Sequence, residues 1–555
     1  MKRFFGLSLC LLLLLPLNAQ AAPPSFLLLD QLGNRVEVVG ADFKLISSFN
    51  TGPAPTSIVS LPDGQGYLLL CRGSATIFGG FSKSGSLLYL DSQLKPGAKN
   101  VSLPGIVVTD IYLKDTATWI IVTKNKNGAP TPAAIDIFNL QTGSDTRFDL
   151  NSIPTAYRFN SDNSELALTT IGSPKSPPQL VLLQLADLKL KTFPVAANPG
   201  GIYFINKQQI MVACGGFRPS SNYSSAIPVE KLDKSVNASL YWIDTESGAA
   251  KITPLGYSPL VVVQDENQPE VFYTACSDIA YGKESEGTFR KIKDGEILSE
   301  VKFPAEATQL IQTQQGTICL LGREEFFLLN QEGTALLANQ NFGLKVAKIL
   351  LNTDETRGYL SVVNSSSMSE INLQTGEIVQ KLKIRGSGLS GLLNIGNLLP
   401  DALPPVSGTP KPADDKPIWA AVNEQVLLNN EQSLIYSLAS NGEVRALDTK
   451  TGQIISSVKF RQGKPYGIHL TPDQKYLVIA TDSIWYLVDP VKNRIQLKIP
   501  LLTGDYPPDT GFYSPDGSLL VIPGNGYFYL VDCQTGKLAG KFRTKIQKAL
   551  VAWLE

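Results

Sequence analysis

The sequence predicts an all-β protein built from repeated four-stranded antiparallel sheets, arranged as in a β-propeller. Two copies of one unit follow each other in Asn441–Gly536, and the turn aspartates Asp448, Asp489 and Asp532 are 41 and 43 residues apart. A period of this length is typical of propeller blades. Short runs rich in β-branched and aromatic residues lie between the turns, as expected for strands.

The first element in the chain is expected to be a secretory signal at residues 1–21. Lys2 and Arg3 precede the apolar run Phe4–Pro16, and Ala19-Gln20-Ala21 has the small-x-small form of a cleavage site. The apolar run is too short for a stable membrane anchor. We therefore expect a secreted protein, periplasmic or extracellular after cleavage, without a membrane span.

The remaining chain is predicted to contain about eleven units, each with the same order of strands and turns. An apolar strand ends in Asp or Asn, and a tight turn closes on Gly. A second strand, a loop, a third strand, a turn of the type Ser-Pro-Asp-Gly and a fourth strand follow. The units are Arg35–Cys71, Leu87–Thr123, Ala134–Thr170, Leu180–Cys214, Leu240–Cys276, Thr288–Leu321, Phe326–Val363, Met368–Ala439, Glu443–Ala480, Ile484–Ile522 and Tyr527–Trp553.

The number of units and one interruption bear on the domain organisation. Eleven exceeds the ~4–8 blades of a usual ring, so we expect two packed propellers, with one large propeller as the alternative. A Gly- and Pro-rich stretch at 387–418 is an insertion or a linker. It divides the array into residues 22–386, with blades 1–8, and residues 419–555, with blades 8–11.

The two ends of the array are expected to complete each other. The last unit, Tyr527–Trp553, lacks a fourth strand, and Phe26–Asp30 is a strand left over before the first unit. Pairing of these segments hides the sheet edges that an open array exposes. We therefore predict that Phe26–Asp30 closes the last blade.

The turn motifs resemble those of a known repeat family. Asp448-Thr449-Lys450-Thr451-Gly452 and Ser514-Pro515-Asp516-Gly517 are similar to the turns of the YVTN family of WD40-like β-propellers, a type with secreted bacterial members. The tetrapeptide that names the family is absent. The resemblance implies the fold of nearly the whole mature chain but no particular activity, because propellers host many unrelated functions.

The long segments fall at equivalent places in the repeat. With strands a to d counted outward from the channel, Arg72–Ser86, Lys124–Ala133, Gly215–Asn237 and Ser277–Gly287 are b–c loops, and Gly386–Lys416 is a d–a loop. All five open on one face, where we expect partner binding. Aromatic and basic residues are common interface anchors, and those we select are Arg72, Phe81, Phe217, Arg218, Tyr223, Tyr257, Arg385, Lys464 and Tyr506.

Composition and rare residues exclude several kinds of chemistry. Lys plus Arg and Asp plus Glu number 49 each, so we expect no nucleic-acid partner. His469 is the single histidine, which excludes a multi-histidine metal site and favours a structural role. The five cysteines after residue 21 show no C-x-x-C spacing, and we expect buried free thiols, with Cys214 and Cys276 as the pair to test.

The function that we expect is a non-catalytic scaffold that binds a protein or an extended ligand on the face with the long loops. We expect no catalytic residue, cofactor or metal. Two alternatives stay open. One is a metal-dependent hydrolase of the lactonase type, which needs carboxylates that converge at the channel. The other is a sensor or assembly subunit of a cell-envelope complex.

Overall fold

A computed structural model describes residues 26–554 of the chain. The longer gaps in this description are residues 75–82, 125–132, 172–176, 217–236, 278–286, 384–424 and 502–511, and further gaps of four residues or fewer occur elsewhere. The described residues form strands, turns and loops and contain no helix.

Among the described residues, the strands form eleven antiparallel sheets, which we number in chain order. Sheet 1 joins both ends of the chain, and sheet 3 carries the extra strand β9 (Tyr112–Leu113) beside β10. Sheets 1 to 4 are β45 (Ala549–Trp553), β1 (Phe26–Asp30), β2 (Arg35–Val39), β3 (Leu45–Asn50); β4 (Pro55–Ser60), β5 (Gly66–Cys71), β6 (Ser86–Asp91), β7 (Pro96–Ser102); β8 (Ile106–Val107), β10 (Thr118–Lys124), β11 (Ala133–Asn139), β12 (Asp145–Asp149); and β13 (Pro154–Phe159), β14 (Glu165–Thr170), β15 (Gln179–Gln184), β16 (Lys189–Pro194). Sheets 5 to 8 are β17 (Pro199–Phe204), β18 (Gln209–Cys214), β19 (Ser239–Asp244), β20 (Ala250–Pro254); β21 (Tyr257–Gln264), β22 (Val271–Ser277), β23 (Gly287–Lys293), β24 (Glu296–Phe303); β25 (Gln309–Gln312), β26 (Ile318–Leu321), β27 (Glu325–Leu329), β28 (Leu336–Asn341); and β29 (Val346–Leu351), β30 (Arg357–Val362), β31 (Ser367–Asn372), β32 (Ile378–Lys383). Sheets 9 to 11 are β33 (Gln425–Leu428), β34 (Leu434–Leu438), β35 (Glu443–Asp448), β36 (Ile454–Lys459); β37 (Pro465–Leu470), β38 (Leu477–Thr481), β39 (Ile484–Asp489), β40 (Arg494–Pro500); and β41 (Phe512–Tyr513), β42 (Leu519–Gly524), β43 (Tyr527–Asp532), β44 (Lys537–Arg543).

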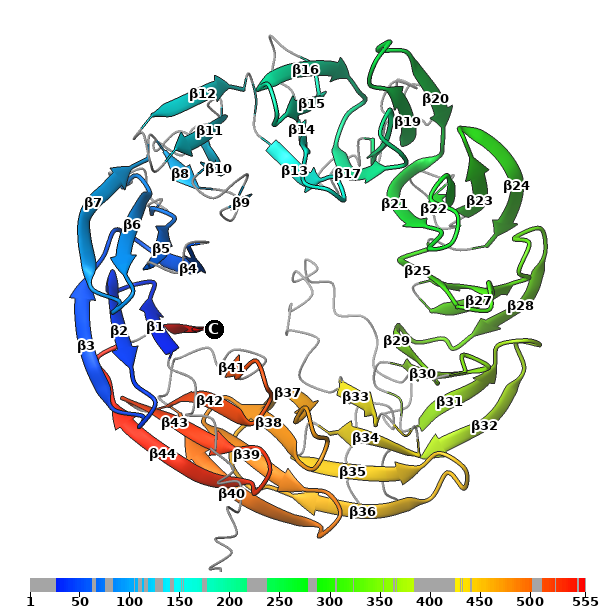
Figure 1. The fold of residues 1–555 in the computed structure, drawn as a ribbon. Helices are drawn as coiled ribbons and strands as arrows, with labels where there is room; N and C mark the ends of the chain where they lie inside the picture. The colour runs from blue at the N-terminus through cyan, green and yellow to red at the C-terminus, as the bar shows by residue number, and fades with distance from the viewer. Residues whose placement is uncertain are drawn as a thin grey trace, which may run out of the picture.

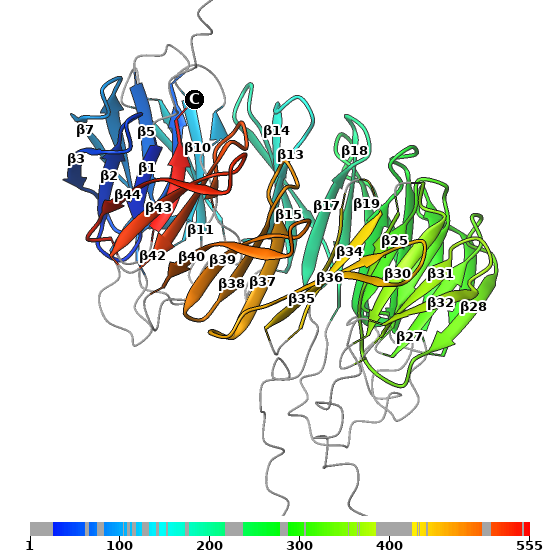
Figure 2. The same ribbon diagram turned by 90° about the horizontal axis from the view of Figure 1, so that it is seen from below.

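The sheets follow one another around one central opening, with the first strand of each sheet innermost (Figure 1). Seen from the side, they stand in a single tier (Figure 2). This all-β arrangement is consistent with a β-propeller. We expected two packed propellers, and the arrangement instead favours the alternative of one large ring. The stretch 387–418 lies outside the described residues, and its flanking strands β32 and β33 belong to sheets 8 and 9.

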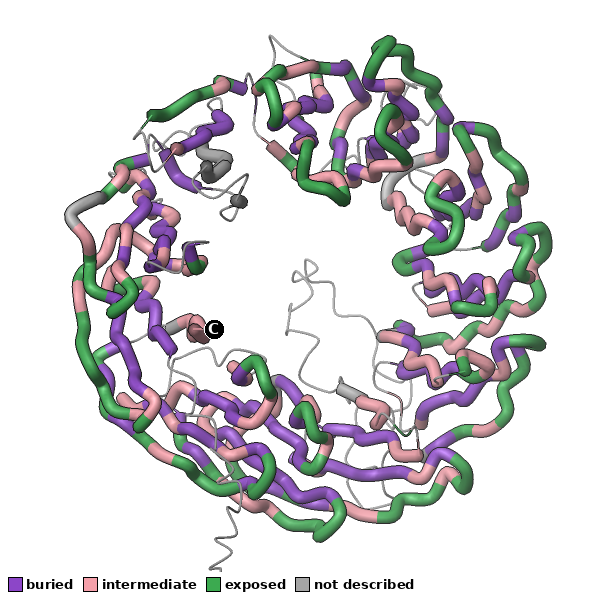
Figure 3. The backbone as a smooth tube through the Cα atoms, viewed as in Figure 1, coloured by how far each residue is buried: buried purple, intermediate pink, exposed green. Residues whose placement is uncertain are grey.

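The core of the protein lies between the sheets. Eleven clusters of buried apolar side chains each join two consecutive sheets, and one of them joins sheet 11 to sheet 1. The middle strands of the sheets are therefore buried, whereas the outer strands and turns are exposed (Figure 3). Because burial of apolar area is the main favourable term in folding, each sheet depends on both neighbours.

The two ends of the chain meet in sheet 1. Strand β1 pairs with β45 over five residues, from Phe26 opposite Trp553 to Asp30 opposite Ala549. The rings of Phe26 and Trp553 lie 4.9 Å apart. The leftover N-terminal strand thus pairs with the strand Ala549–Trp553 of the last unit. It packs against, but does not pair with, Phe528 of β43 in the neighbouring sheet.

The tight turns between third and fourth strands follow the sequence signature. The Asp448 carboxylate accepts hydrogen bonds from the backbone N–H groups of Lys450 and Thr451, at 2.9 and 2.8 Å. The backbone at Gly452 has a φ of 67°, in the left-handed region that glycine favours. The equivalent bonds form at Asp244, Asn372 and Asp532.

These turns also connect neighbouring sheets. At five interfaces in the described part of the chain, a side chain on the outer strand of one sheet donates a hydrogen bond to a carbonyl oxygen in the corresponding turn of the next sheet. The pairs are Lys191 and Thr245, Thr253 and Gly295, Gln340 and Gly376, Gln380 and Thr449, and Ser456 and Pro490. We call these contacts the outer-strand latches.

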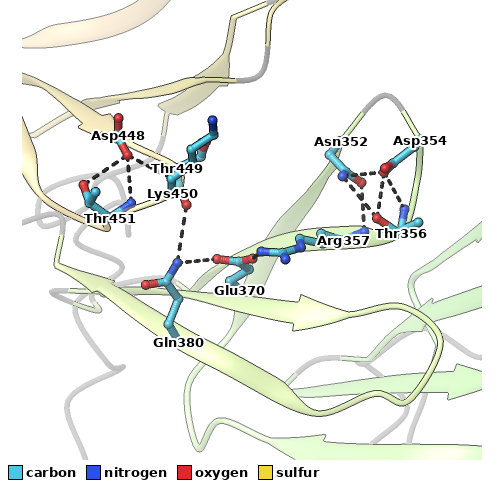
Figure 4. A network of polar contacts seen from close by, with 10 residues as sticks. All are labelled: Asn352, Asp354, Thr356, Arg357, Glu370, Gln380, Asp448, Thr449, Lys450 and Thr451. Atoms are coloured by element: carbon cyan, nitrogen blue, oxygen red, sulfur yellow. Dashed lines mark hydrogen bonds and ion pairs between the residues drawn. The ribbon is translucent and has the colours of Figure 1, made fainter.

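One latch is part of a larger polar network between sheets 8 and 9 (Figure 4). Glu370, buried in the middle of β31, accepts hydrogen bonds from Arg357 of β30 and, at 2.6 Å, from Gln380 of β32. The Gln380 amide also donates to the Thr449 carbonyl of sheet 9 at 3.4 Å. The buried charge is thus paired, as burial of a carboxylate requires.

The packing in sheet 1 gives a first prediction. Leu28 of β1 is fully buried. We expect Leu28→Ala to lower the free energy of unfolding by about 3 kcal/mol, because it leaves a cavity between sheets 1 and 11. Urea unfolding followed by intrinsic fluorescence measures the change.

The matched control is Leu32→Ala, because Leu32 lies just after β1 and is 65% exposed. Its stability should stay within about 0.5 kcal/mol of the parent. Equal stability of the Leu28→Ala variant and the parent would show that β1 does not hold the two ends together.

A second prediction concerns the turn glycine of a latch. At Gly376, with a φ of 74°, an added Cβ would lie 2.0 Å from the Cβ of Ala338 on β28 of the preceding sheet. We therefore expect Gly376→Ala to lower the free energy of unfolding through two effects. The strain of a left-handed residue contributes about 1–2 kcal/mol, and the clash with Ala338 contributes about 1–3 kcal/mol more. Thermal unfolding of purified variants measures both.

Gly343→Ala is the control for this experiment. Its φ is 63°, but no atom lies within 4 Å of the added Cβ, so only the strain applies. The second change Ala338→Gly should restore part of the stability lost in Gly376→Ala. If Gly343→Ala and Gly376→Ala are equally unstable, the close approach of the turn to the preceding sheet is unimportant.

Candidate binding face and cavity

The antiparallel order of the strands gives the ring two different faces. The turns between first and second strands and between third and fourth strands share one face, which we call the turn face. The connections between second and third strands and between successive sheets share the other, which we call the insertion face. The five long segments connect β5 to β6, β10 to β11, β18 to β19, β22 to β23 and β32 to β33. Their flanking strand ends therefore all lie on the insertion face.

Three of the nine predicted binding residues fall among the described residues. Arg72 follows β5 in sheet 2, Tyr257 begins β21 in sheet 6, and Lys464 precedes β37 in sheet 10. All three lie on the insertion face, but on separate sheets, so the structure does not bring them together in one site. The other six lie outside the described residues: Phe81, Phe217, Arg218, Tyr223, Arg385 and Tyr506.

Lys464 and Arg72 are positioned by their backbones. The Lys464 N–H donates to the Asp482 carboxylate at 2.9 Å, and the Asp482 N–H donates back to the Lys464 carbonyl at 3.0 Å. The Arg72 N–H donates to the Ala54 carbonyl at 2.9 Å. Both side chains are half-buried at the start or end of a strand.

A cavity of about 340 Å³ lies between sheets 9 and 10, against the connection that leads from β36 to β37. The end of β36 and the connection that follows it form one side, and β39 and β40 form the other. Its lining residues are Lys459, Phe460, Arg461, Gln462, Tyr486, Ile495 and Lys498. The sequence predicts Lys464 of the same connection as a binding residue, but it does not predict these lining residues.

The floor of the cavity is aromatic and held in place. The Phe460 and Tyr486 rings stack with centroids 4.7 Å apart, and both side chains are buried. The Tyr486 hydroxyl donates a 2.8 Å hydrogen bond to the Gln462 carbonyl, which fixes the connection after β36 to the next sheet. Burial raises the pKa of Tyr486, so its hydroxyl remains a donor.

The rim of the cavity is cationic. Lys459, Arg461 and Lys498 are exposed, and no carboxylate is among the lining residues. Among the described residues, none of these three cations forms an ion pair. The Lys498 ammonium lies 5.9 Å from the centre of the Tyr486 ring. This position is within the range of a cation–π contact.

The carboxylates of the turn face are used within their own turns. Hydrogen bonds from Thr451 hold the pKa of Asp448 below its ordinary value, and those from Ser247 do the same for Asp244. A hydrogen bond from the Ser514 hydroxyl lowers the pKa of Asp516 in the same way. These acids remain ionised near neutral pH, but as acceptors for their own turn.

His469 lies on β37, where it contacts the next sheet. Its ring stands edge-on to Trp485 and to Tyr513, at 6.4 and 5.7 Å. Neither ring nitrogen has a hydrogen-bond partner among the described residues. Burial lowers the pKa of His469 to about 4, so the imidazole is neutral near pH 7. The structural role that the sequence predicted for this residue fits these surroundings.

Metal ligands and thiols are the other groups that the sequence raises as candidates for chemistry. The described residues contain no group of three or more His, Cys, Asp or Glu side chains that could hold a metal ion. Cys71, Cys214, Cys276, Cys319 and Cys533 are all buried and free, as the sequence predicted, so Cys214 and Cys276 are not bonded to each other. Burial raises the pKa of the Cys214 and Cys319 thiols to about 12, which leaves them protonated and unreactive. No helix in the described part of the chain could span a membrane.

Comparison with known proteins gives likeness only at the level of solved structures. No protein-family model and no curated protein matches the chain. A dihydro-heme d1 dehydrogenase, NirN, in complex with DHE aligns with 95% of this chain and 75% of its own, at 9% identity and a TM-score of 0.33. The computationally designed Ika8 protein covers 68% of this chain and 94% of its own, at 11% identity and a TM-score of 0.32. A eukaryotic initiation factor covers 76% of this chain and 95% of its own, at 10% identity and a TM-score of 0.40. Likeness at this level carries no argument about function.

The half-buried His469 gives a prediction about pH. Because the folded-state pKa of His469 is about 4 and the ordinary value is 6.5, the unfolded chain binds a proton that the folded chain does not. The stabilising contribution is therefore present above about pH 6.5 and is lost as the pH falls toward 4, by at most on the order of 3 kcal/mol. His469→Phe should flatten the dependence of the unfolding free energy on pH in this window, measured by urea unfolding.

Tyr513→Phe is the control, because it alters the same contact without changing a group that titrates in this range. It should keep the pH dependence of the parent. The carboxylates contribute equally to all three proteins. An unchanged slope in His469→Phe would therefore show that folding does not shift the pKa of His469.

Proposed function

We propose that the chain is a closed, eleven-bladed propeller of the YVTN/WD40-like type, exported by means of residues 1–21. Its function is that of a non-catalytic scaffold that binds a protein or an extended ligand on the insertion face. The pairing of β1 with β45 and the apolar cluster between sheets 11 and 1 support the closure. Residues 387–418 are then an insertion between blades 8 and 9.

One observation carries the functional proposal. The five long segments all connect strand ends on the insertion face, whereas the turn face has short turns whose polar groups bond within the turn or latch a neighbouring sheet. Variation in loop length alone does not account for this division between faces. A rigid scaffold that positions long loops on one face is typical of binding proteins.

The proposal is tested by replacing a long segment. Residues 217–236 connect β18 to β19, and a short Gly-Ser linker in their place should leave the sheets intact and abolish capture of the partner. Tagged parent and variant chains are cross-linked in cells, purified and compared by quantitative mass spectrometry. Thermal unfolding confirms that the variant is folded.

A change on the turn face is the matched control. Glu246→Lys alters an exposed residue in the turn after β19 of the same sheet, and it should leave partner capture unchanged. Equal capture by the linker variant and the parent contradicts the proposal. One divalent metal ion per purified chain contradicts it as well and favours the hydrolase. A partner from the cell envelope identifies the scaffold as a sensor or assembly subunit.

A further inference from the structure

We propose that the cavity between sheets 9 and 10 binds an acidic segment of a partner protein, with one apolar side chain inside the cavity and carboxylates at the rim. This inference rests on the proposed function and names the chemistry of the partner. It follows from the size, the floor and the charge of the cavity.

The size and the floor of the cavity determine which chemical groups can bind inside it. A cavity of about 340 Å³ is at the small end of the range for ligand sites, so it suits one side chain or a small organic group. Phe460, Tyr486 and the half-buried Ile495 give it an apolar wall. The stacking of Phe460 on Tyr486 and the hydrogen bond from Tyr486 to Gln462 hold this wall in place before any ligand binds.

The rim defines the charge of the ligand. Lys459 ends β36 of sheet 9, Arg461 lies in the connection that follows, and Lys498 belongs to β40 of sheet 10. Three cations therefore line one cavity. The Glu443 carboxylate, opposite Lys459 on β35, forms its ion pair with Arg445 and accepts a hydrogen bond from Ser457. A ligand with one carboxylate can pair with only one of these three cations. A peptide with several acidic residues offers a carboxylate for each of them.

The position of the cavity favours a peptide over a free metabolite. Its lining includes Arg461 and Gln462 of the connection from β36 to β37, which belongs to the insertion face, where the long segments connect. A partner bound on this face can place an extended acidic segment along the outer edge of sheets 9 and 10. Aromatic and arginine side chains around such a pocket are the usual anchors of an interface.

Fluorescence anisotropy tests the inference with the full chain. The probe is a short fluorescein-labelled peptide in which glutamates alternate with leucines, and the same peptide with lysines for glutamates is the negative probe. We expect salt-sensitive binding of the acidic peptide only. The double variant Arg461→Glu, Lys498→Glu should weaken binding about tenfold or more.

Two further variants separate a specific site from general charge attraction. Lys541→Glu is the matched control, because Lys541 is an exposed lysine of β44 that lies 5.5 Å from the Tyr527 ring outside the cavity. It should change the affinity less than about twofold. Ile495→Trp fills the cavity without a change in charge and should also abolish binding. Melting temperatures confirm that all variants are folded.

The outcomes distinguish this inference from the proposed function. Equal binding of both peptides, or equal affinity of the parent and the double variant, overturns the inference. If 4-phenylbutyrate binds as tightly as the acidic peptide and is lost in the same variants, the ligand is a small carboxylate and the peptide assignment is wrong. If the double variant still captures the partner and the parent does not bind the peptide, only this inference is overturned. If the parent binds the acidic peptide but partner capture does not depend on residues 217–236, only the proposed function is overturned.

Discussion

The structure depends on apolar packing between consecutive sheets. A four-stranded sheet with two apolar faces cannot keep either face in water, so every sheet needs a neighbour on both sides. All five residues of β1 are buried, although β1 begins the described chain. Its partner β45 comes from the other end of the chain, and the cluster around Phe26 and Phe528 joins sheet 1 to sheet 11. In the closed ring that we propose, this pairing covers the two sheet faces that a linear array would leave exposed.

Packing alone does not set the orientation of one sheet relative to the next, and the outer-strand latches add a directional constraint. Each latch connects an outer strand to a turn of the following sheet, as Gln380 does with the Thr449 carbonyl. The glycine of such a turn combines two requirements. At Gly376 the backbone is left-handed, and Ala338 of the preceding sheet occupies the space of a Cβ. The turn motif is therefore part of the interface between sheets as well as a local turn.

The sequence predicted the order of strands well because the turn signature is local chemistry. Asp448 bonds its own turn, and this placed β35, β36, β37 and β38 correctly as third, fourth, first and second strands. Whether the sheets form one ring or two depends on the angle between neighbouring sheets, and the repeat motif does not encode this angle. The cavity was missed for a related reason. Lys459 and Lys498 are 39 residues apart and on different sheets, so only the packing of sheets 9 and 10 brings them to one rim.

The two faces of the ring differ in how their polar groups are used. On the turn face, Asp448 and its equivalents accept hydrogen bonds from their own turns, so these carboxylates have little capacity left for a ligand. On the insertion face, Lys459, Arg461 and Lys498 surround a preformed apolar floor in a chain whose acidic and basic residues are equal in number. A cationic rim over a rigid cavity requires little ordering when a ligand binds. This cationic rim, which has no ion-pair partner among the described residues, is the physical basis on which we propose ligand recognition on this face.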